Sequence, residues 1–275
     1  MKSFRAELTI DYIGTRGDGV ATVYGATVYV PATAPGDTVK VALSEERDGR
    51  FSGKLLELLT PGPDRREPPC QHFSQCGGCA LQHITPDAYA AWKTSLLTDT
   101  LTRNGLDCPM IEPLQISPPG SRRRATFAVV RRKDDAIVGF NARASHQVID
   151  LQACPVVLPN IEALIAPLRD WAMLALRSGD TAEVHLAMTD SGLDLLLRTV
   201  ARIGGKGRDA LIGLMAMHDL ARVSRAHPRQ DGIEILAEAR PARLVFGGVP
   251  VSLSPGGFSQ ATADGEAALT AFVLD

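Results

Sequence analysis

The chain has 275 residues, a hydrophobic content of 45% and a formal net charge of −2. This length predicts two domains and part of a third, and the near-neutral charge excludes overall basic attraction to nucleic acid, so any such signal must be local. The start, "MKSFRAELTI", lacks the apolar run of a signal peptide, and no later run is long enough to cross a bilayer. We therefore expect a cytoplasmic protein without a membrane partner, in which clustered cysteines serve metal or redox chemistry.

Residues 1–60 predict a small β-barrel. Five short stretches of strand-like alternation are separated by turns such as "GTRGDG" and "APGD". Short strands with regular Gly and Pro punctuation favour a barrel of the OB type. Barrels of this type have many functions, so this prediction assigns none.

Residues 61–253 predict a second domain that begins with a proline-rich linker. A helix is expected after Thr85, because Pro86 suits the first helical position and Asn104-Gly105 suits the end. Its apolar stripe predicts core packing for Tyr89, Trp92, Leu96, Leu97 and Leu101. Farther on, "DSG" at 190–192 predicts a hairpin turn and "KGRDALIGLMAMHDL" a helix. Strands and helices in mixed order favour an α+β domain over a doubly wound sheet.

The stretch "CQHFSQCGGC" holds three of the five cysteines, Cys70, Cys76 and Cys79. Gly77-Gly78 allows the backbone to fold tightly around a bound centre. A four-coordinate site needs one more thiolate, and both Cys108 and Cys154 are candidates. Thiolate ligands suit zinc or an iron–sulfur cluster, and the spacing lacks the paired C-x2-C knuckles of structural zinc sites. A cubane cluster fits best, with zinc or buried structural cysteines as the alternatives.

The longer stretch "CQHFSQCGGCALQHI" resembles the cluster loop of the iron–sulfur 23S rRNA (uracil-5-)-methyltransferases. Residues 1–60 resemble the TRAM domain of that family, and "SRRRATFAVV" with "VGFNARASHQVIDLQACPVV" resembles its central domain. The resemblance implies that Cys70, Cys76, Cys79 and Cys154 hold a [4Fe-4S] cluster, with Cys108 outside it. It also implies a TRAM/OB-like barrel over 1–60, a central RNA-recognition domain over 61–253 and the start of a methyltransferase domain over 254–275.

Two segments predict contacts with RNA. Six basic residues lie between 122 and 133, and on a strand Arg122 and Arg124 share one face that suits phosphates. The alternative is a solvated strand edge guarded by charge. The segment "LSPGGFSQATADGEAAL" resembles the F-x-Q segment of the family. There the resemblance implies that Phe258 stacks on the target base and that Gln260 lies between the uracil and the methyl donor, although Phe258 also suits ordinary packing.

The sequence ends at "ALTAFVLD", about where the Rossmann-like domain of the family begins. We therefore expect a β-barrel followed by an α+β domain, with the Rossmann-like domain absent and no catalytic nucleophile or base present. The implied function is the N-terminal and central part of an S-adenosylmethionine-dependent RNA (uracil-5-)-methyltransferase, inactive alone and with an incomplete donor site. The TRAM likeness favours rRNA over tRNA, and no obligate protein partner is evident. The alternative is a non-catalytic RNA-binding module with an iron–sulfur cluster or zinc.

Overall fold

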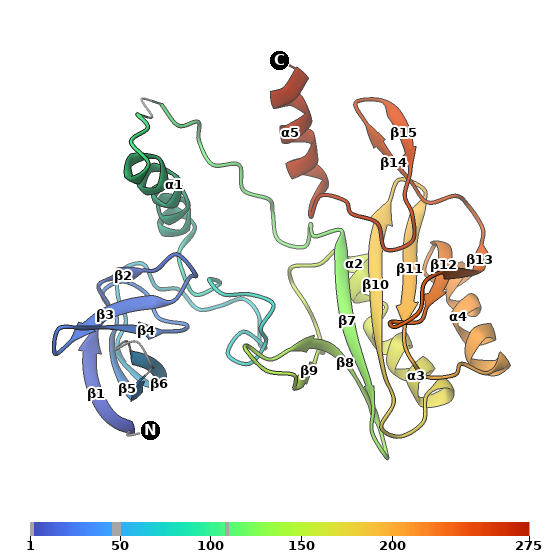
Figure 1. The fold of residues 1–275 in the computed structure, drawn as a ribbon, viewed down its shortest axis with the longest axis horizontal. Helices are drawn as coiled ribbons and strands as arrows, with labels where there is room; N and C mark the ends of the chain where they lie inside the picture. The colour runs from blue at the N-terminus through green and yellow to red at the C-terminus, as the bar shows by residue number, and fades with distance from the viewer. Residues whose placement is uncertain (1–2, 46–50, 108–109, 275) are drawn as a thin grey trace. The chain divides into compact units, whose positions relative to one another are not determined.

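The computed structural model describes residues 3–45, 51–107 and 110–274, which Figure 1 draws from the N-terminus to the C-terminus. The chain divides into two compact units. The first comprises Met1–Ser74 and Cys79–Leu114, and the second comprises Gln75–Gly78 and Gln115–Asp275. Cys108, one of the two candidates for a fourth thiolate, lies outside the described residues. The domain boundaries predicted at 60/61 and 253/254 stay predictions.

The first unit is built on a six-stranded sheet with the order β1-β5-β6-β4-β3-β2. Alternating side chains of the strands enclose a core in which Val39, Val41 and Leu43 of β5 are fully buried. Only β4 and β6 pair in parallel among the described strands of this sheet. The strands are β1 (Ser3–Thr9), β2 (Tyr12–Ile13), β3 (Gly19–Val23), β4 (Ala26–Val30), β5 (Thr38–Glu45) and β6 (Phe51–Thr60).

Helix α1 (Pro86–Arg103) confirms the predicted helix at both ends. Thr85 is its N-cap residue and Asn104 its C-cap residue. The predicted core stripe is confirmed only in the first half of the helix. Tyr89 and Trp92 pack beside the buried side chain of Ile84, and Trp92 Nε1 donates a hydrogen bond of 3.2 Å to the Ile13 carbonyl. No described residue of α1 is fully buried, and Leu97 is 47% exposed, so the second half of the stripe lacks a core to join.

Asp37 ties the start of β5 to the loop that follows β6. Its fully buried carboxylate accepts hydrogen bonds from the backbone N–H groups of Ala34 (2.6 Å) and Gly62 (2.8 Å). Arg65 donates to the same carboxylate from Nε (2.9 Å) and from its terminal nitrogen (2.6 Å). Burial raises the pKa of Asp37, but the bonds from Arg65, Gly62 and Ala34 outweigh it and hold that pKa below its ordinary value of 3.8.

We predict that Asp37→Asn lowers the free energy of unfolding by about 3–5 kcal/mol, because it leaves the Arg65 guanidinium without its carboxylate. Since the folded-state pKa is depressed, the contribution of Asp37 is complete above about pH 4 and is lost as pH falls further. Denaturant titrations at several pH values measure both effects. Glu57→Gln, which breaks the exposed pair between Lys40 and Glu57, is the control. An equal loss in Glu57→Gln would contradict the assignment.

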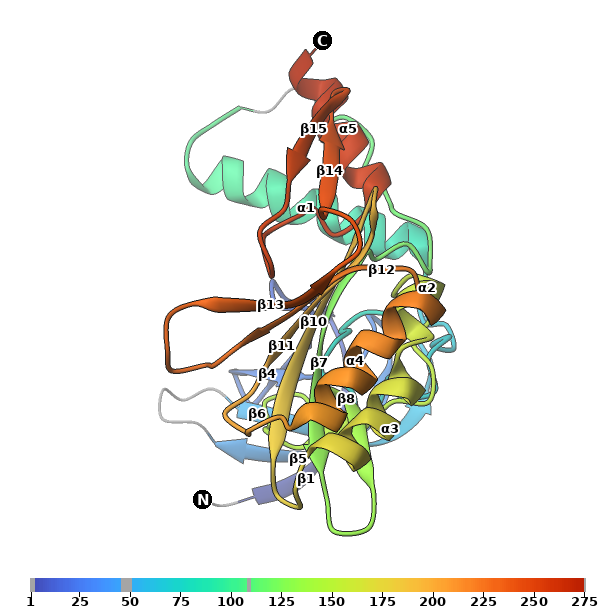
Figure 2. The ribbon, with the colours of Figure 1, turned by 90° about the vertical axis from the view of Figure 1, so that its right-hand side faces the viewer.

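The second unit is built on a seven-stranded sheet with the order β13-β12-β11-β10-β7-β8-β9. Figure 2 shows helices α3 and α4 on the same face of this sheet, in agreement with their contacts to β7, β8 and β12. The strands are β7 (Arg124–Arg131), β8 (Ala136–Asn141), β9 (Val148–Asp150), β10 (Thr181–Thr189), β11 (Gly192–Arg198), β12 (Leu220–Ala226) and β13 (Ile233–Glu238). The helices are α2 (Pro159–Glu162), α3 (Ile165–Ala175), α4 (Gly205–Met217) and α5 (Ala263–Leu274), and a separate hairpin joins β14 (Arg243–Phe246) to β15 (Val249–Ser252).

The two faces of this sheet differ in chemistry because side chains alternate along each strand. Phe127, Val184 and Leu195 belong to the core on the helix-covered face. Their neighbours along the strands point the other way. They form what we call the polar face, defined by Arg124, Thr126, Glu183, His185 and Asp194.

The fold class predicted from the sequence, a barrel followed by an α+β domain without Rossmann-like structure, is wrong. In the second unit β11 and β12 are parallel neighbours joined by α4. This strand–helix–strand crossover is the unit from which Rossmann-like sheets are built. The helix over α4 was predicted, but the direction in which it returns the chain was not.

Candidate functional site

A hollow of about 230 Å³ lies on the polar face of the second unit. Strands β7, β10 and β11 form its floor, and Gly256 and Gly257 close one side. The hollow therefore collects side chains from three strands and one loop that are far apart in sequence. The predicted site residues Arg122 and Arg124 both line it.

Arg122 and Arg124 bring positive charge to this hollow. Neither guanidinium forms an ion pair with any of the carboxylates that the structure describes. Arg124 instead lies over the ring of Phe258, with 4.6 Å from its guanidinium carbon to the ring centroid. Phe258 is 69% exposed, so its ring is available to a ligand and is not part of a core. The structure thus brings together three of the sequence-predicted RNA contacts.

The floor of the hollow carries polar groups that the sequence did not identify. Thr126 Oγ1 and His185 Nδ1 are 3.0 Å apart on the paired strands β7 and β10. His185 Nε2 lies 3.6 Å from a carboxylate oxygen of Glu183. Burial lowers the pKa of His185 despite this neighbour, so the imidazole is neutral at pH 7. The positive charge of the hollow therefore comes from the two arginines.

A buried ion pair borders the floor. Asp194 lines the hollow and accepts a hydrogen bond of 2.8 Å from Arg222 Nε on the neighbouring strand β12. A charged residue inside the apolar run "LDLLL" is the signal from which sequence reasoning could have found this position.

Phe258 and Gln260 lie in residues 253–262. This segment contains no strand and ends where α5 begins. Arg222 donates a bond of 2.8 Å to the Leu253 carbonyl at its start. Gly256 has a φ of +70° and lies so near Leu196 that a Cβ atom would stand 2.6 Å from Leu196 Cδ2. The positive φ favours glycine there, and any larger residue would also have to displace the end of the Leu196 side chain.

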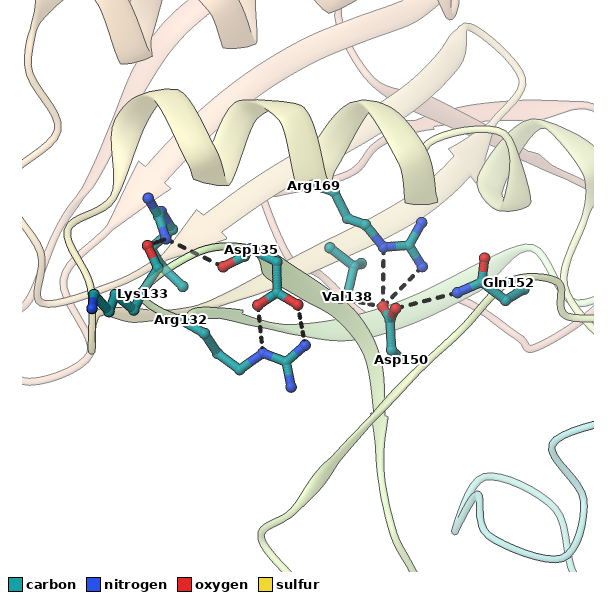
Figure 3. A network of polar contacts seen from close by, with 8 residues as sticks. Arg132, Lys133, Asp135, Val138, Asp150, Gln152 and Arg169 are labelled. Carbon is teal, nitrogen blue, oxygen red and sulfur yellow. Dashed lines mark hydrogen bonds and ion pairs between the residues drawn. The ribbon is translucent and has the colours of Figure 1, made fainter.

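The basic stretch 122–133 does not form one continuous face. Arg123 is buried, and Arg131, Arg132 and Lys133 lie at the opposite end of β7, about 23 Å from Arg124 at 3.3 Å per residue. Figure 3 shows Arg132 paired with Asp135 at the turn between β7 and β8. Of the six basic residues, only Arg122 and Arg124 face the hollow.

The four cysteines of the predicted cluster are divided between the two units. Cys70 and Cys79 belong to the first unit, and Cys76 and Cys154 to the second. All four retain their thiols and form no disulfide, so the donor chemistry fits a thiolate-bound cluster. The described residues contain no group of three or more His, Cys, Asp or Glu side chains arranged to hold a metal. The cluster therefore stays a prediction.

Two local features support these cysteines within the second unit. The Gly77 N–H donates a bond of 2.9 Å to the Asn141 carbonyl, and a Cβ atom on Gly77 would stand 2.8 Å from that oxygen. A glycine after Cys76 is therefore needed for the loop to approach the end of β8. Near Cys154, Arg169 pairs with Asp150 at 2.9 Å, which fixes α3 to the end of β9 (Figure 3). The Cys154 N–H donates a bond of 2.8 Å to Glu162.

No protein-family model matches the chain, but individual relatives do. An RNA methyltransferase of Brucella suis is 38% identical over 268 residues, which is 98% of this chain and 62% of that protein. An RNA methyltransferase of Rhizobium meliloti is 36% identical over 97% of this chain and 63% of its own length. These relatives carry the name RNA methyltransferase. The chain spans less than two thirds of their length.

A relative with a more specific name matches a shorter region. The 23S rRNA (uracil(1939)-C(5))-methyltransferase of Pectobacterium atrosepticum is 36% identical over 194 residues, 70% of this chain and 43% of that protein. Among solved structures, the Pyrococcus abyssi tRNA (uracil-54, C5)-methyltransferase bound to S-adenosyl-L-homocysteine matches with a TM-score of 0.71. That match covers 97% of this chain and 64% of the other at 19% identity, and at this identity it shows the fold alone.

The structural match completes the correction of the fold class. The sequence predicted a barrel and an α+β domain, with the Rossmann-like methyltransferase domain absent from the chain. Instead, 97% of the chain follows the fold of a uracil-C5 methyltransferase. None of the helices in the described ranges is both long and apolar enough to cross a membrane.

Proposed function

We propose that this chain is part of an S-adenosylmethionine-dependent RNA methyltransferase that acts on carbon 5 of uracil. One observation carries the proposal: two arginines that form no ion pair with a described carboxylate line one hollow, and the exposed ring of Phe258 lies against one of them, Arg124. It occurs in a chain of which 98% aligns, at 38% identity, with an uncharacterized RNA methyltransferase of Brucella suis. The 36% identity to a 23S rRNA enzyme favours rRNA over tRNA as the substrate.

The described residues suit the binding part of this reaction. Arg122 and Arg124 present guanidinium groups that bind phosphates and stack on bases. Phe258 offers a ring face for a uracil that has left its helix, and the amide of Gln260 suits the polar edge of that base. S-adenosylmethionine, when bound, supplies the methyl group. We assign Gln260 to the side of the base that faces the methyl donor.

We also propose that Cys70, Cys76, Cys79 and Cys154 hold a [4Fe-4S] cluster with a structural role. Four thiols and a glycine-bearing loop support this proposal, and zinc is the alternative metal for the same donors. The cytoplasmic location expected from the sequence belongs to the same proposal, because the substrate would be ribosomal RNA.

A titration of labelled single-stranded RNA with the purified 275-residue chain tests the proposal. We expect weak binding that decreases as salt increases, because the contacts are to phosphates. Absence of RNA binding at low salt would contradict the proposed function.

A further inference from the structure

The two proposed base-reading side chains lie on a segment that needs support. Phe258 and Gln260 lie in residues 253–262, which contain no strand and no helix and lead directly into α5. A segment of this kind does not hold a side chain in place by its own hydrogen bonds. Productive geometry at a binding site requires supporting groups that fix the segment from outside.

Arg123 makes four contacts around this segment. Its backbone N–H donates a bond of 2.8 Å to the Ala261 carbonyl, and its own carbonyl accepts one of 2.7 Å from Met188 on β10. Its Nε donates a bond of 2.9 Å to the Gln260 carbonyl. Its terminal nitrogen forms an ion pair with Glu266 of α5. One side chain therefore fixes the main chain at Gln260 and the first turns of the following helix.

Arg123 is separated by burial from its two neighbours in the triplet "RRR". The residue is only 6% exposed, while Arg122 and Arg124 line the hollow. A buried guanidinium is stable only when its hydrogen bonds and its charge are satisfied, and here a carbonyl and a carboxylate do both. The planar fork of arginine reaches the two acceptors together, which a lysine ammonium does not reproduce. This geometry explains an arginine at a buried position.

We propose that Arg123 is a positioning residue that sets where the Phe258 ring and the Gln260 amide stand. It acts through the Gln260 carbonyl and is not itself in contact with RNA. The functional importance of Arg123 rests on the proposed function, because Phe258 and Gln260 are the residues proposed to contact the base. The physical claim, that Arg123 orders this segment, is separate and is measured without RNA.

The test uses a fluorine signal at position 258. The chain contains two tryptophans, Trp92 and Trp171, so Phe258→Trp labelled with 5-fluorotryptophan gives three ¹⁹F resonances, one of which reports the segment. In this parent protein we expect the resonance of position 258 to differ in shift from the free amino acid, because the ring lies beside Arg124.

Arg123→Lys is the decisive variant. Lysine keeps a positive charge for Glu266 but lacks the Nε donor that bonds the Gln260 carbonyl. We expect the resonance of position 258 to sharpen and move toward the shift of free 5-fluorotryptophan. The resonance of Trp171, which is 2% exposed in the core, should not move.

Two further variants separate positioning from general support. Arg169→Lys is the matched control, because Arg169 also bonds a carboxylate, Asp150, and a carbonyl, that of Leu151. It should leave the resonance of position 258 unchanged. Glu266→Gln retains an oxygen acceptor for Arg123 and should move that resonance less than Arg123→Lys does.

Three results would overturn the inference. The first is an unchanged resonance of position 258 in Arg123→Lys. The second is movement of all three resonances together, which would mean that Arg123 supports the whole fold. The third is an equal or larger shift in Glu266→Gln, which would assign the ordering to the ion pair. Failure of the proposed function would be seen in another measurement. The resonance of position 258 in the parent protein would not change when uridine-containing RNA is added.

Discussion

Protein purified without oxygen is expected to be brown and to contain iron and sulfide, and Cys154→Ser is expected to lose both. The expectation follows from the spacing of Cys70, Cys76 and Cys79 and from the thiol at Cys154, which is 7% exposed. Loss of one thiolate removes a quarter of the ligands of a cubane cluster. Iron and sulfide assays with the visible spectrum measure the result.

The same variant is expected to lower thermal stability. A cluster that includes Cys154 closes a loop of 154 − 79 = 75 residues counted from Cys79. By analogy with other cross-links, closing a loop of this length stabilises the folded state by about 4 kcal/mol, so Tm should fall by on the order of 10 °C. Calorimetry of the two proteins measures this shift. An unchanged Tm would contradict a structural role.

Cys108→Ser is the control for the cluster, because the resemblance leaves that thiol outside the ligand set. It should retain the iron and sulfide of the unaltered protein. Stoichiometric zinc without visible absorption would refute the cluster, and loss of iron in Cys108→Ser would refute the ligand assignment.

Reversing the charge of both Arg122 and Arg124 to glutamate is expected to abolish RNA binding at moderate salt. These two guanidinium groups line the hollow and form no ion pair within the described ranges, so they account for its positive charge. Each lost phosphate contact should reduce the salt slope of binding by about one unit. Electrophoretic mobility shift at several salt concentrations measures affinity and slope together.

The structure offers a matched control for this reversal. Arg131 and Arg132 lie on the same stretch of sequence, but Arg132 pairs with Asp135 and Arg131 bonds the Lys133 carbonyl at 3.0 Å. Reversing their charges should change RNA binding much less. Phe258→Ala should also change it little, because the ring acts on a displaced base and not on the backbone. A larger loss from Phe258→Ala or from the control pair would mean that the RNA surface is elsewhere.

The local parts of the fold were predictable from the sequence. Pro86 and Asn104 mark the ends of α1 through rules that involve only neighbouring residues, and the structure confirms them. The hairpin at 190–192 and the helix over α4 are confirmed for the same reason. The parallel pairing of β11 with β12 was not predicted, because strand direction depends on how α4 packs against the sheet. Local signals do not carry that information.

The candidate site was predictable only in part. The strand-like alternation expected over 122–124 puts Arg122 and Arg124 on one side, and both line the hollow, although Arg122 precedes β7; grouping Arg131 and Arg132 with them ignores the length of the strand. The sequence does not distinguish Arg123 from the other basic residues outside the Arg122/Arg124 face, because its partner Glu266 is 143 positions away. Long-range partners of this kind decide which arginine of a triplet is buried, and a single sequence does not reveal them.

The most direct measurement of the central claim is nucleoside mass spectrometry of RNA from cells in which the gene encoding this chain is disrupted. Our account predicts that 23S rRNA loses a 5-methyluridine, that tRNA is unchanged, and that the intact gene restores the modification. A gene carrying Phe258→Ala with Gln260→Ala should fail to restore it. Unchanged 5-methyluridine in both rRNA and tRNA would contradict the account.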